Sequence, residues 1–160
     1  MRLSLGIRGK STFICQSAIL IMQLSTEEQD NVTSIRVLVV DDQKDVLQVM
    51  QLILARQHNY CVETAFSGKQ ALEKAETFSP DVVVSDISMP EMDGCELMTQ
   101  LREKSNLSPF KSIALSGYGG YHEEMTRAAG YDVHLMKPVD YNNLKTIIDQ
   151  LAQENVSVAE

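Results

Sequence analysis

Five polar residues are the best candidates for chemistry in this chain, although they lie far apart in the sequence. They are Asp41, Asp42, Asp86, Ser116 and Lys137, and each stands at or just after the C-terminal end of a short apolar run. In an open parallel sheet the C-terminal ends of the strands emerge at one edge, where ligands bind. We therefore expect three carboxylates, a hydroxyl and an amine to meet there. Such a group can hold a divalent metal ion and a phosphoryl group.

The three carboxylates need a counter-charge if they converge. Two carboxylates about 4 Å apart repel each other by roughly 4 kcal/mol at an effective dielectric constant near 20. Lys137 supplies one positive charge, and Mg²⁺ would supply two more through the oxygen ligands that it prefers. The set contains no His or Cys that would favour zinc. Asp86 stands alone at its strand end, so it is the candidate nucleophile for forming an aspartyl phosphate.

Each residue also has an ordinary interpretation. Asp41 and Asp42 are typical of residues that cap a following helix, and Asp86, Ser116 and Lys137 are common in loops at strand exits. The occurrence of all five on successive strand ends favours a shared site.

Apolar runs and helical stripes alternate along the chain from position 34 onward. The runs predict five strands, at 35–40, 60–65, 81–86, 111–116 and 131–136. The stripes between them predict five helices, at 45–57, from Ser67 to Phe78, after Asp93, up to about Ala129, and after Asp140. Ser67 and Gln70 have the spacing of a capping box, and Gly130 is a candidate helix C-cap. This alternation predicts a doubly wound α/β domain over 34–153.

The overall charge and the cysteines narrow the class of protein. The formal charge is -8 and no basic cluster appears late in the chain, which argues against nucleic-acid binding. The three cysteines, Cys15, Cys61 and Cys95, are scattered, odd in number and without a CxxC pair. They indicate a reducing compartment, so we expect a cytoplasmic protein.

Residues 1–33 differ from the rest of the chain. We expect an N-terminal extension that is poorly ordered, or a translation start that is really at Met22. The mildly apolar stretch at 13–24 is too short and too polar to span a bilayer, so we expect no membrane association. Residues 154–160 are expected to form a short tail.

Four sequence motifs resemble those of the receiver domain of bacterial two-component response regulators. They are VLVVDD, VVVSDISMPEMDG, ALSG and LMKPV, and they cover the chain from about Ile35 to Gln153. Asp86 follows Asp42 by 44 residues, and Lys137 follows Asp86 by 51. The segments ALSGYG and GYDVHLMKPV resemble the corresponding segments of receivers attached to hybrid histidine kinases. The resemblance implies a flavodoxin-like fold, with five helices around a five-stranded parallel sheet of order 2-1-3-4-5.

The resemblance also implies roles for the acidic residues. Asp86 would accept a phosphoryl group from a sensor histidine kinase or a histidine phosphotransfer protein. Asp41, Asp42 and Asp86, with the backbone carbonyl of Ser88, would hold Mg²⁺. The chain would then be a signalling phosphoacceptor in a phosphorelay, assisting only its own phosphorylation and dephosphorylation rather than acting as an enzyme.

Further residues take roles by the same resemblance. Lys137 would pair with Asp86 at rest and with the phosphoryl oxygens afterwards, and Ser116 would reorient to bind them. His134 stands where the family often has Tyr or Phe, so it is the candidate switch residue. The Lys137–Pro138 bond is expected to be cis. Ser88 and Tyr118 would tune the rate of dephosphorylation.

The resemblance also implies a surface for binding a target protein, and two other functions remain possible. The face formed by the fourth helix, fifth strand and fifth helix would bind an unidentified protein target, with Tyr121, His122, His134 and Tyr141 at its edge. One rival is a pseudo-receiver that binds partners without phosphorylation. The other is a Mg²⁺-dependent phosphatase with an aspartyl nucleophile, but such enzymes carry DxDx[TV] where this chain has DDQK.

Overall fold

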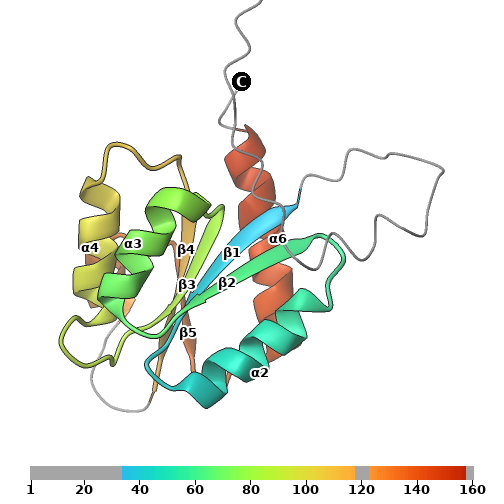
Figure 1. The fold of residues 1–160 in the computed structure, drawn as a ribbon, viewed down its shortest axis with the longest axis horizontal. Helices are drawn as coiled ribbons and strands as arrows, with labels where there is room; N and C mark the ends of the chain where they lie inside the picture. The colour runs from blue at the N-terminus through green and yellow to red at the C-terminus, as the bar shows by residue number, and fades with distance from the viewer. Residues whose placement is uncertain (1–33, 118–122, 158–160) are drawn as a thin grey trace, which may run out of the picture. The chain divides into compact units, whose positions relative to one another are not determined.

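Strands and helices alternate through the part of the chain that the computed structural model describes, residues 34–117 and 123–157 (Figure 1). The described strands are β1 (Ile35–Val40), β2 (Tyr60–Ala65), β3 (Val82–Asp86), β4 (Lys111–Ser116) and β5 (Val133–Met136). The described helices are α2 (Lys44–Ala55), α3 (Gly68–Phe78), α4 (Gly94–Glu103), α5 (Glu123–Ala129) and α6 (Tyr141–Ser157). The expectations for residues 1–33 and for Tyr118, Tyr121 and His122 lie outside the described residues.

The strands form one parallel sheet in the order β2-β1-β3-β4-β5. The fold expected from the sequence is therefore confirmed. The register pairs Val40 of β1 with Ser85 of β3, and Ser116 of β4 with Met136 of β5. The C-terminal ends of the four strands β1, β3, β4 and β5 therefore lie at one edge of the sheet, where the candidate residues follow.

Helices cover both faces of the sheet, with α2 and α6 on one face and α3 and α4 on the other (Figure 1). Strand β1 shows why, because its alternate side chains point to opposite faces. Val37 and Val39 pack into the core that includes α2 and α6, and Leu38 and Val40 pack into the core that includes α3 and α4. A strand buried on both faces needs the uninterrupted apolar run that the sequence has.

The N-caps of α3 and α4 are the residues that the sequence predicts, but the predicted capping box of α3 is only partly formed. Asp93 caps α4 by accepting a hydrogen bond from the Glu96 N–H at 2.8 Å. Ser67 caps α3 by accepting from the Gln70 N–H at 3.2 Å. The Gln70 side chain accepts from the Phe66 N–H at 2.9 Å and not from Ser67 as a capping box requires, so that prediction was half right.

Helix α6 continues to Ser157, past the expected end of the last helix at 153. Two contacts hold its final turns against the sheet. Glu154 lies 3.0 Å from the Lys111 Nζ, and the Asn155 side-chain amide donates to the Asp81 carbonyl at 3.0 Å. Among the described residues, no helix combines the length and the apolar character needed to cross a membrane.

Arg102 of α4 joins three segments on its side of the sheet. Its guanidinium lies 4.2 Å from the centre of the Phe110 ring and donates to the Phe110 carbonyl at 2.8 Å. It also donates to the Gly130 carbonyl at 2.9 Å and to the Asp132 carboxylate at 2.9 Å. Arg102 thus fixes the loop between α5 and β5 to α4, and Gly130 in that loop has the positive φ of 101° expected of a C-cap glycine.

Candidate functional site

Three carboxylates converge at the C-terminal edge of the sheet. Asp41 and Asp42 directly follow β1, and Asp86 is the last residue of β3. One oxygen of each carboxylate lies within 4.8 Å of the other two. Asp41 and Asp86 are buried, with 1% and 3% of their surfaces exposed, and Asp42 is half-buried. The structure thus places Asp41, Asp42 and Asp86 together at the edge of the sheet, as the strand pattern predicts.

Lys137 joins this cluster from the loop after β5. Its Nζ lies 3.0 Å from the Asp41 Oδ2 and 3.0 Å from the Asp86 Oδ1. Burial lowers the pKa of Lys137, but its hydrogen bonds to the two carboxylates outweigh this effect and the pKa is raised. The Lys137–Pro138 peptide bond is cis. A single ammonium group is thus shared between carboxylates from two neighbouring strands.

The geometry of Asp41 is not that of a helix cap. Its Oδ1 accepts a hydrogen bond from the Gln43 N–H at 2.9 Å, and its Oδ2 faces Lys137. The N-cap of α2 is Gln43, which makes no side-chain capping bond. The ordinary interpretation of Asp41 as a cap of the next helix is therefore wrong.

Asp86 is held in a tight setting. Burial raises its pKa above the ordinary value, because the hydrogen bond from Lys137 and a backbone hydrogen bond from Ser88 offset burial only in part. Gly94, the first residue of α4, packs against the same turn. A Cβ at Gly94 would lie 2.5 Å from the Asp86 carbonyl oxygen and 2.8 Å from the Ile87 Cα. A glycine is therefore required for α4 to start this close to Asp86.

Ser116 and His134 form a second part of the site, on β4 and β5. The Ser116 Oγ lies 2.7 Å from the His134 Nε2, so the ring already contacts the hydroxyl in this structure. The other ring nitrogen, Nδ1, lies 3.0 Å from the Thr126 Oγ1 on α5. No sequence pattern singles out Thr126 or Gly94 as a functional residue. Thr126 is one polar residue in a short polar helix, and the close contact of Gly94 is visible only once α4 is docked.

The donor set fits Mg²⁺. Every side chain in the cluster offers oxygen ligands, and one or two carboxylates, water and phosphate oxygens are the usual shell of this ion. The half-buried position of Asp42 leaves one side of the cluster open to such additional ligands. Ser88, two residues after Asp86, is exposed at the same turn. Tyr118 lies outside the described residues.

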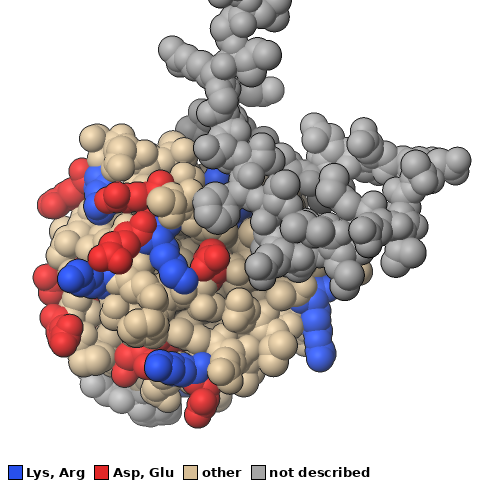
Figure 2. Space-filling model, in the orientation of Figure 1, with Lys and Arg blue, Asp and Glu red and all other residues tan. Residues whose placement is uncertain are grey.

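Charge on the visible face of the molecule is mixed. Figure 2 shows acidic and basic side chains interspersed on that face of the described residues, without a continuous basic patch. A protein that binds nucleic acid needs a basic footprint of this kind. The visible face of the described residues carries no such footprint.

Comparison with known proteins assigns the family. The sequence profile described as "Response regulator receiver domain" matches residues 37–149. The chain belongs to this family. Receiver domains are the signalling domains of two-component systems, and they generally bind Mg²⁺.

Relatives of this receiver domain include a longer regulatory protein and proteins of similar length. The alkaline phosphatase synthesis transcriptional regulatory protein PhoP of Bacillus subtilis is 42% identical over 103 residues, 64% of this chain but 42% of PhoP. The chain thus spans less than half the length of PhoP. A 14.6 kDa protein of Leptolyngbya boryana is 37% identical over 117 residues, 71% of this chain and 87% of that protein. The chemotaxis protein CheY4 of Vibrio cholerae superposes with a TM-score of 0.67 at 30% identity, covering 74% of this chain and 98% of CheY4.

Proposed function

We propose that this receiver domain accepts a phosphoryl group on Asp86 from a phosphohistidine donor and thereby changes its affinity for a protein target. The observation that carries the proposal is the position of Lys137, 3.0 Å from both Asp86 and Asp41 within a cluster of three carboxylates. A buried carboxylate next to an ammonium group and two further carboxylates that can bind a metal ion is suited to charge neutralisation around a phosphoryl group. Phosphoryl transfer depends mainly on such positioning and neutralisation.

The transfer would form one bond to phosphorus and break another. A lone pair of an Asp86 carboxylate oxygen forms the new P–O bond, and the electron pair of the breaking P–N bond stays on the donor imidazole. Lys137 would move from the Asp86 Oδ1 to a phosphoryl oxygen, and the Ser116 hydroxyl would donate to another. The donor would be a sensor histidine kinase or a histidine phosphotransfer protein, which the family assignment supports.

Magnesium would be held by Asp41, Asp42 and Asp86 together with the Ser88 carbonyl. When bound, the ion supplies positive charge that neutralises the carboxylates and the phosphoryl oxygens. Within the chain, Lys137 has a different task, because its fixed charge keeps Asp86 and Asp41 together before the donor arrives. The odd number of cysteines and the lack of a CxxC pair support a cytoplasmic location for this chemistry.

The output surface would be formed by α5, β5 and α6. Two large apolar side chains are exposed there, Met125 on α5 and Met136 on β5, with 50% and 59% of their surfaces accessible. Exposed apolar side chains of this size are typical of surfaces that bind other proteins. Phosphorylation would shift an existing equilibrium between two forms of this surface.

Acetyl phosphate with Mg²⁺ provides the direct test. Intact-protein mass spectrometry should show one added phosphoryl group on the native protein, stable to acid and labile to base. The label should be absent in Asp86→Asn and when EDTA replaces Mg²⁺. Asp93→Asn is the matched control, because it removes a nearby carboxylate outside the cluster and should keep the label.

Other outcomes would support the rival functions. A folded native protein that binds Mg²⁺ but is labelled neither by acetyl phosphate nor by a phosphorylated histidine kinase would contradict the proposal and favour the pseudo-receiver. Steady hydrolysis of a generic phosphate ester such as p-nitrophenyl phosphate, abolished by Asp86→Asn, would favour the phosphatase.

A further inference from the structure

Thr126 is an unusual residue for its position in α5. Its side chain is 1% exposed, and it is the only buried one in this seven-residue helix, all of which is described. Valine has the same shape and would fill the same space without burying a hydroxyl group, which is costly unless the hydroxyl is hydrogen-bonded. The hydroxyl therefore needs partners, and the structure gives it two.

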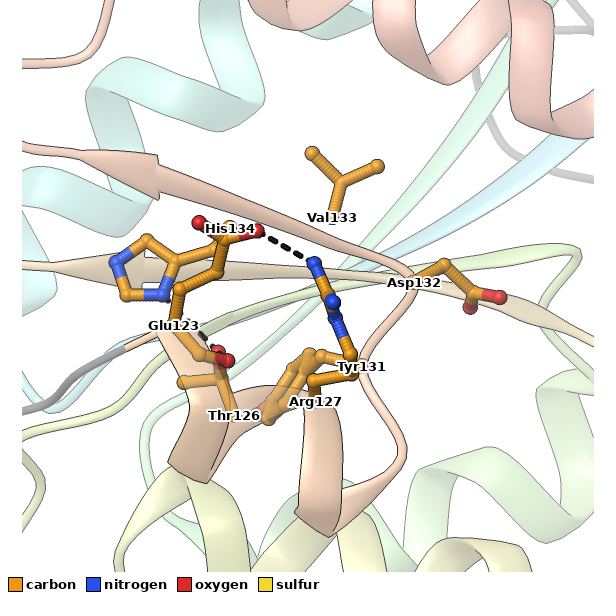
Figure 3. Close-up of a pocket in the computed structure, with 7 residues that line it drawn as sticks. All are labelled: Glu123, Thr126, Arg127, Tyr131, Asp132, Val133 and His134. Atoms are coloured by element: carbon orange, nitrogen blue, oxygen red, sulfur yellow. Dashed lines mark hydrogen bonds and ion pairs between the residues drawn. The ribbon is translucent and has the colours of Figure 1, made fainter.

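One partner is a backbone carbonyl and the other is His134. The Thr126 Oγ1 donates to the Glu123 carbonyl at 2.9 Å and lies 3.0 Å from the His134 Nδ1. Figure 3 shows Thr126 reaching from α5 toward the His134 ring on β5, with the Glu123–Arg127 ion pair beside them. The same ring contacts the Ser116 Oγ at 2.7 Å through Nε2. His134 thus links α5 to the hydroxyl of the candidate site.

The number of protons on each group determines which group donates and which accepts in these hydrogen bonds. A hydroxyl has one proton, and Thr126 gives its proton to the Glu123 carbonyl, so its oxygen accepts from His134 Nδ1–H. A neutral imidazole carries only one N–H, which leaves Nε2 as an acceptor. The Ser116 hydroxyl must then donate to Nε2. In this arrangement the Ser116 proton is committed to the ring and is not free for another acceptor.

We propose that Thr126 is a positioning residue that holds His134 as the Nδ1–H tautomer. In the resting protein the Ser116 hydroxyl proton is therefore bonded to the His134 ring and is not available to an incoming phosphoryl oxygen. This inference rests on the proposed function, since it concerns the hydroxyl that would bind the phosphoryl group. Ser116 has to break its bond to Nε2 before it can donate to that group. Thr126 therefore restrains the switch from α5, outside the acidic cluster.

Removing the Thr126 hydroxyl should release this restraint. In Thr126→Val the Nδ1 loses its acceptor, so the ring favours the Nε2–H tautomer and donates to Ser116. Ser116 can then accept from the ring and donate to a phosphoryl oxygen at the same time. In Thr126→Val, Ser116 therefore keeps its hydrogen bond to the ring when a phosphoryl group binds, whereas the native protein has to break it. The difference corresponds to an affinity increase on the order of fivefold. Thr126→Ser keeps the hydroxyl and should behave as the native protein.

The tautomer can be read directly in the native protein. We expect ring ¹⁵N NMR of His134 at neutral pH to show a protonated Nδ1 and a bare Nε2, and Thr126→Val to reverse this pattern. Mg²⁺ with beryllofluoride, a mimic of the phosphoryl group, should then bind about fivefold more tightly to Thr126→Val than to the native protein. In a His134→Phe background, Thr126→Val should change the affinity by less than a factor of two, because Thr126 acts through the ring.

The outcomes separate this inference from the proposed function. If beryllofluoride binds neither the native protein nor Thr126→Ser, the proposed function fails and the inference fails with it. If both bind but native His134 is the Nε2–H tautomer, only the inference is overturned. It is also overturned if Thr126→Val binds with native affinity, or with equal gain in the presence and absence of His134. Should Thr126→Val fail to fold, the native tautomer and the Thr126→Ser variant still decide the matter.

Discussion

Replacing Lys137 by methionine should destabilise the fold far more than replacing a comparable surface lysine. The Lys137 side chain is 26% exposed, and its Nζ lies 3.0 Å from each of two nearly inaccessible carboxylates, those of Asp41 and Asp86. At an effective dielectric constant near 20, each pair contributes about 5 kcal/mol of attraction before desolvation is subtracted. Removing one partner of a buried ion pair typically costs 3–5 kcal/mol, because the remaining charge stays buried and unpaired. We expect Lys137→Met to lower the free energy of unfolding by about 3 kcal/mol in EDTA at neutral pH.

Lys111→Met is the matched control for this measurement. The Lys111 side chain is 24% exposed and also has two acidic partners, Asp132 at 3.8 Å and Glu154 at 3.0 Å. Those carboxylates are more exposed, at 29% and 60%, so solvent can compensate their loss of a partner. Exposed ion pairs contribute about 0–1 kcal/mol, and the Lys111 variant should lose no more than that.

Urea denaturation of both variants, with and without Mg²⁺, tests the reasoning. An ion that binds only the folded state adds stability by mass action, and the carboxylates left without Lys137 should bind Mg²⁺ more tightly. Mg²⁺ should therefore narrow the gap between Lys137→Met and the native protein, and should leave the Lys111→Met gap unchanged. Equal losses in the two variants, or a Lys137→Met gap that ignores Mg²⁺, would show that the shared ammonium is not what balances this cluster.

Three further predictions concern Gly94, Asp86 and Arg102. Gly94→Ala should cost about 2 kcal/mol or more because its Cβ would meet the backbone at Asp86, whereas a Cβ at Gly117 would meet none of the described residues within 4 Å; thermal unfolding of both variants checks this contrast. Burial raises the pKa of Asp86, so the stability linked to its protonation is present in acid and is lost as pH rises through the raised pKa. Asp86→Asn should therefore gain stability relative to the native protein as the pH rises above the ordinary Asp pKa of about 4 in EDTA, and parallel pH dependences of the two unfolding free energies would contradict this expectation. Arg102→Lys keeps the charge but loses the planar fork of donors to Phe110 and Gly130, so we expect a loss of about 2 kcal/mol in chemical denaturation, with a near-zero loss as the contrary result.

The sequence was sufficient for the sheet and for the acidic end of the site. Residues 37–40 of β1 and 82–84 of β3 are buried on both faces of the sheet, so their apolar runs are unbroken and polar residues follow at the strand ends. Asp41 and Asp86 stand at those ends, and parallel strands that end at one edge must bring them together. The geometry of the cluster therefore follows from topology and needs no detail of packing.

The parts that could not be predicted depend on how elements dock. The role of Gly94 comes from the approach of α4 to the turn after β3, which no local pattern encodes. The two partners of His134 come from β4 and α5, and the sequence does not indicate which way its ring turns. The extra length of α6 likewise depends on contacts of Glu154 and Asn155 with residues more than forty positions away.

The hydrogen bond from Arg102 to Gly130 holds the C-terminal end of α5 in place, so α5 can tilt about that end. Thr126 stands four residues from Gly130 and Glu123 stands seven, so at 1.5 Å per residue their distances from Gly130 along the helix axis are about 6 Å and about 10.5 Å. A tilt of α5 about Gly130 that moves Thr126 by a given amount would therefore move the first turn of the helix roughly 1.75 times as far. If a turn of the His134 ring displaced Thr126, the first turn of α5 would therefore move farther than Thr126 itself.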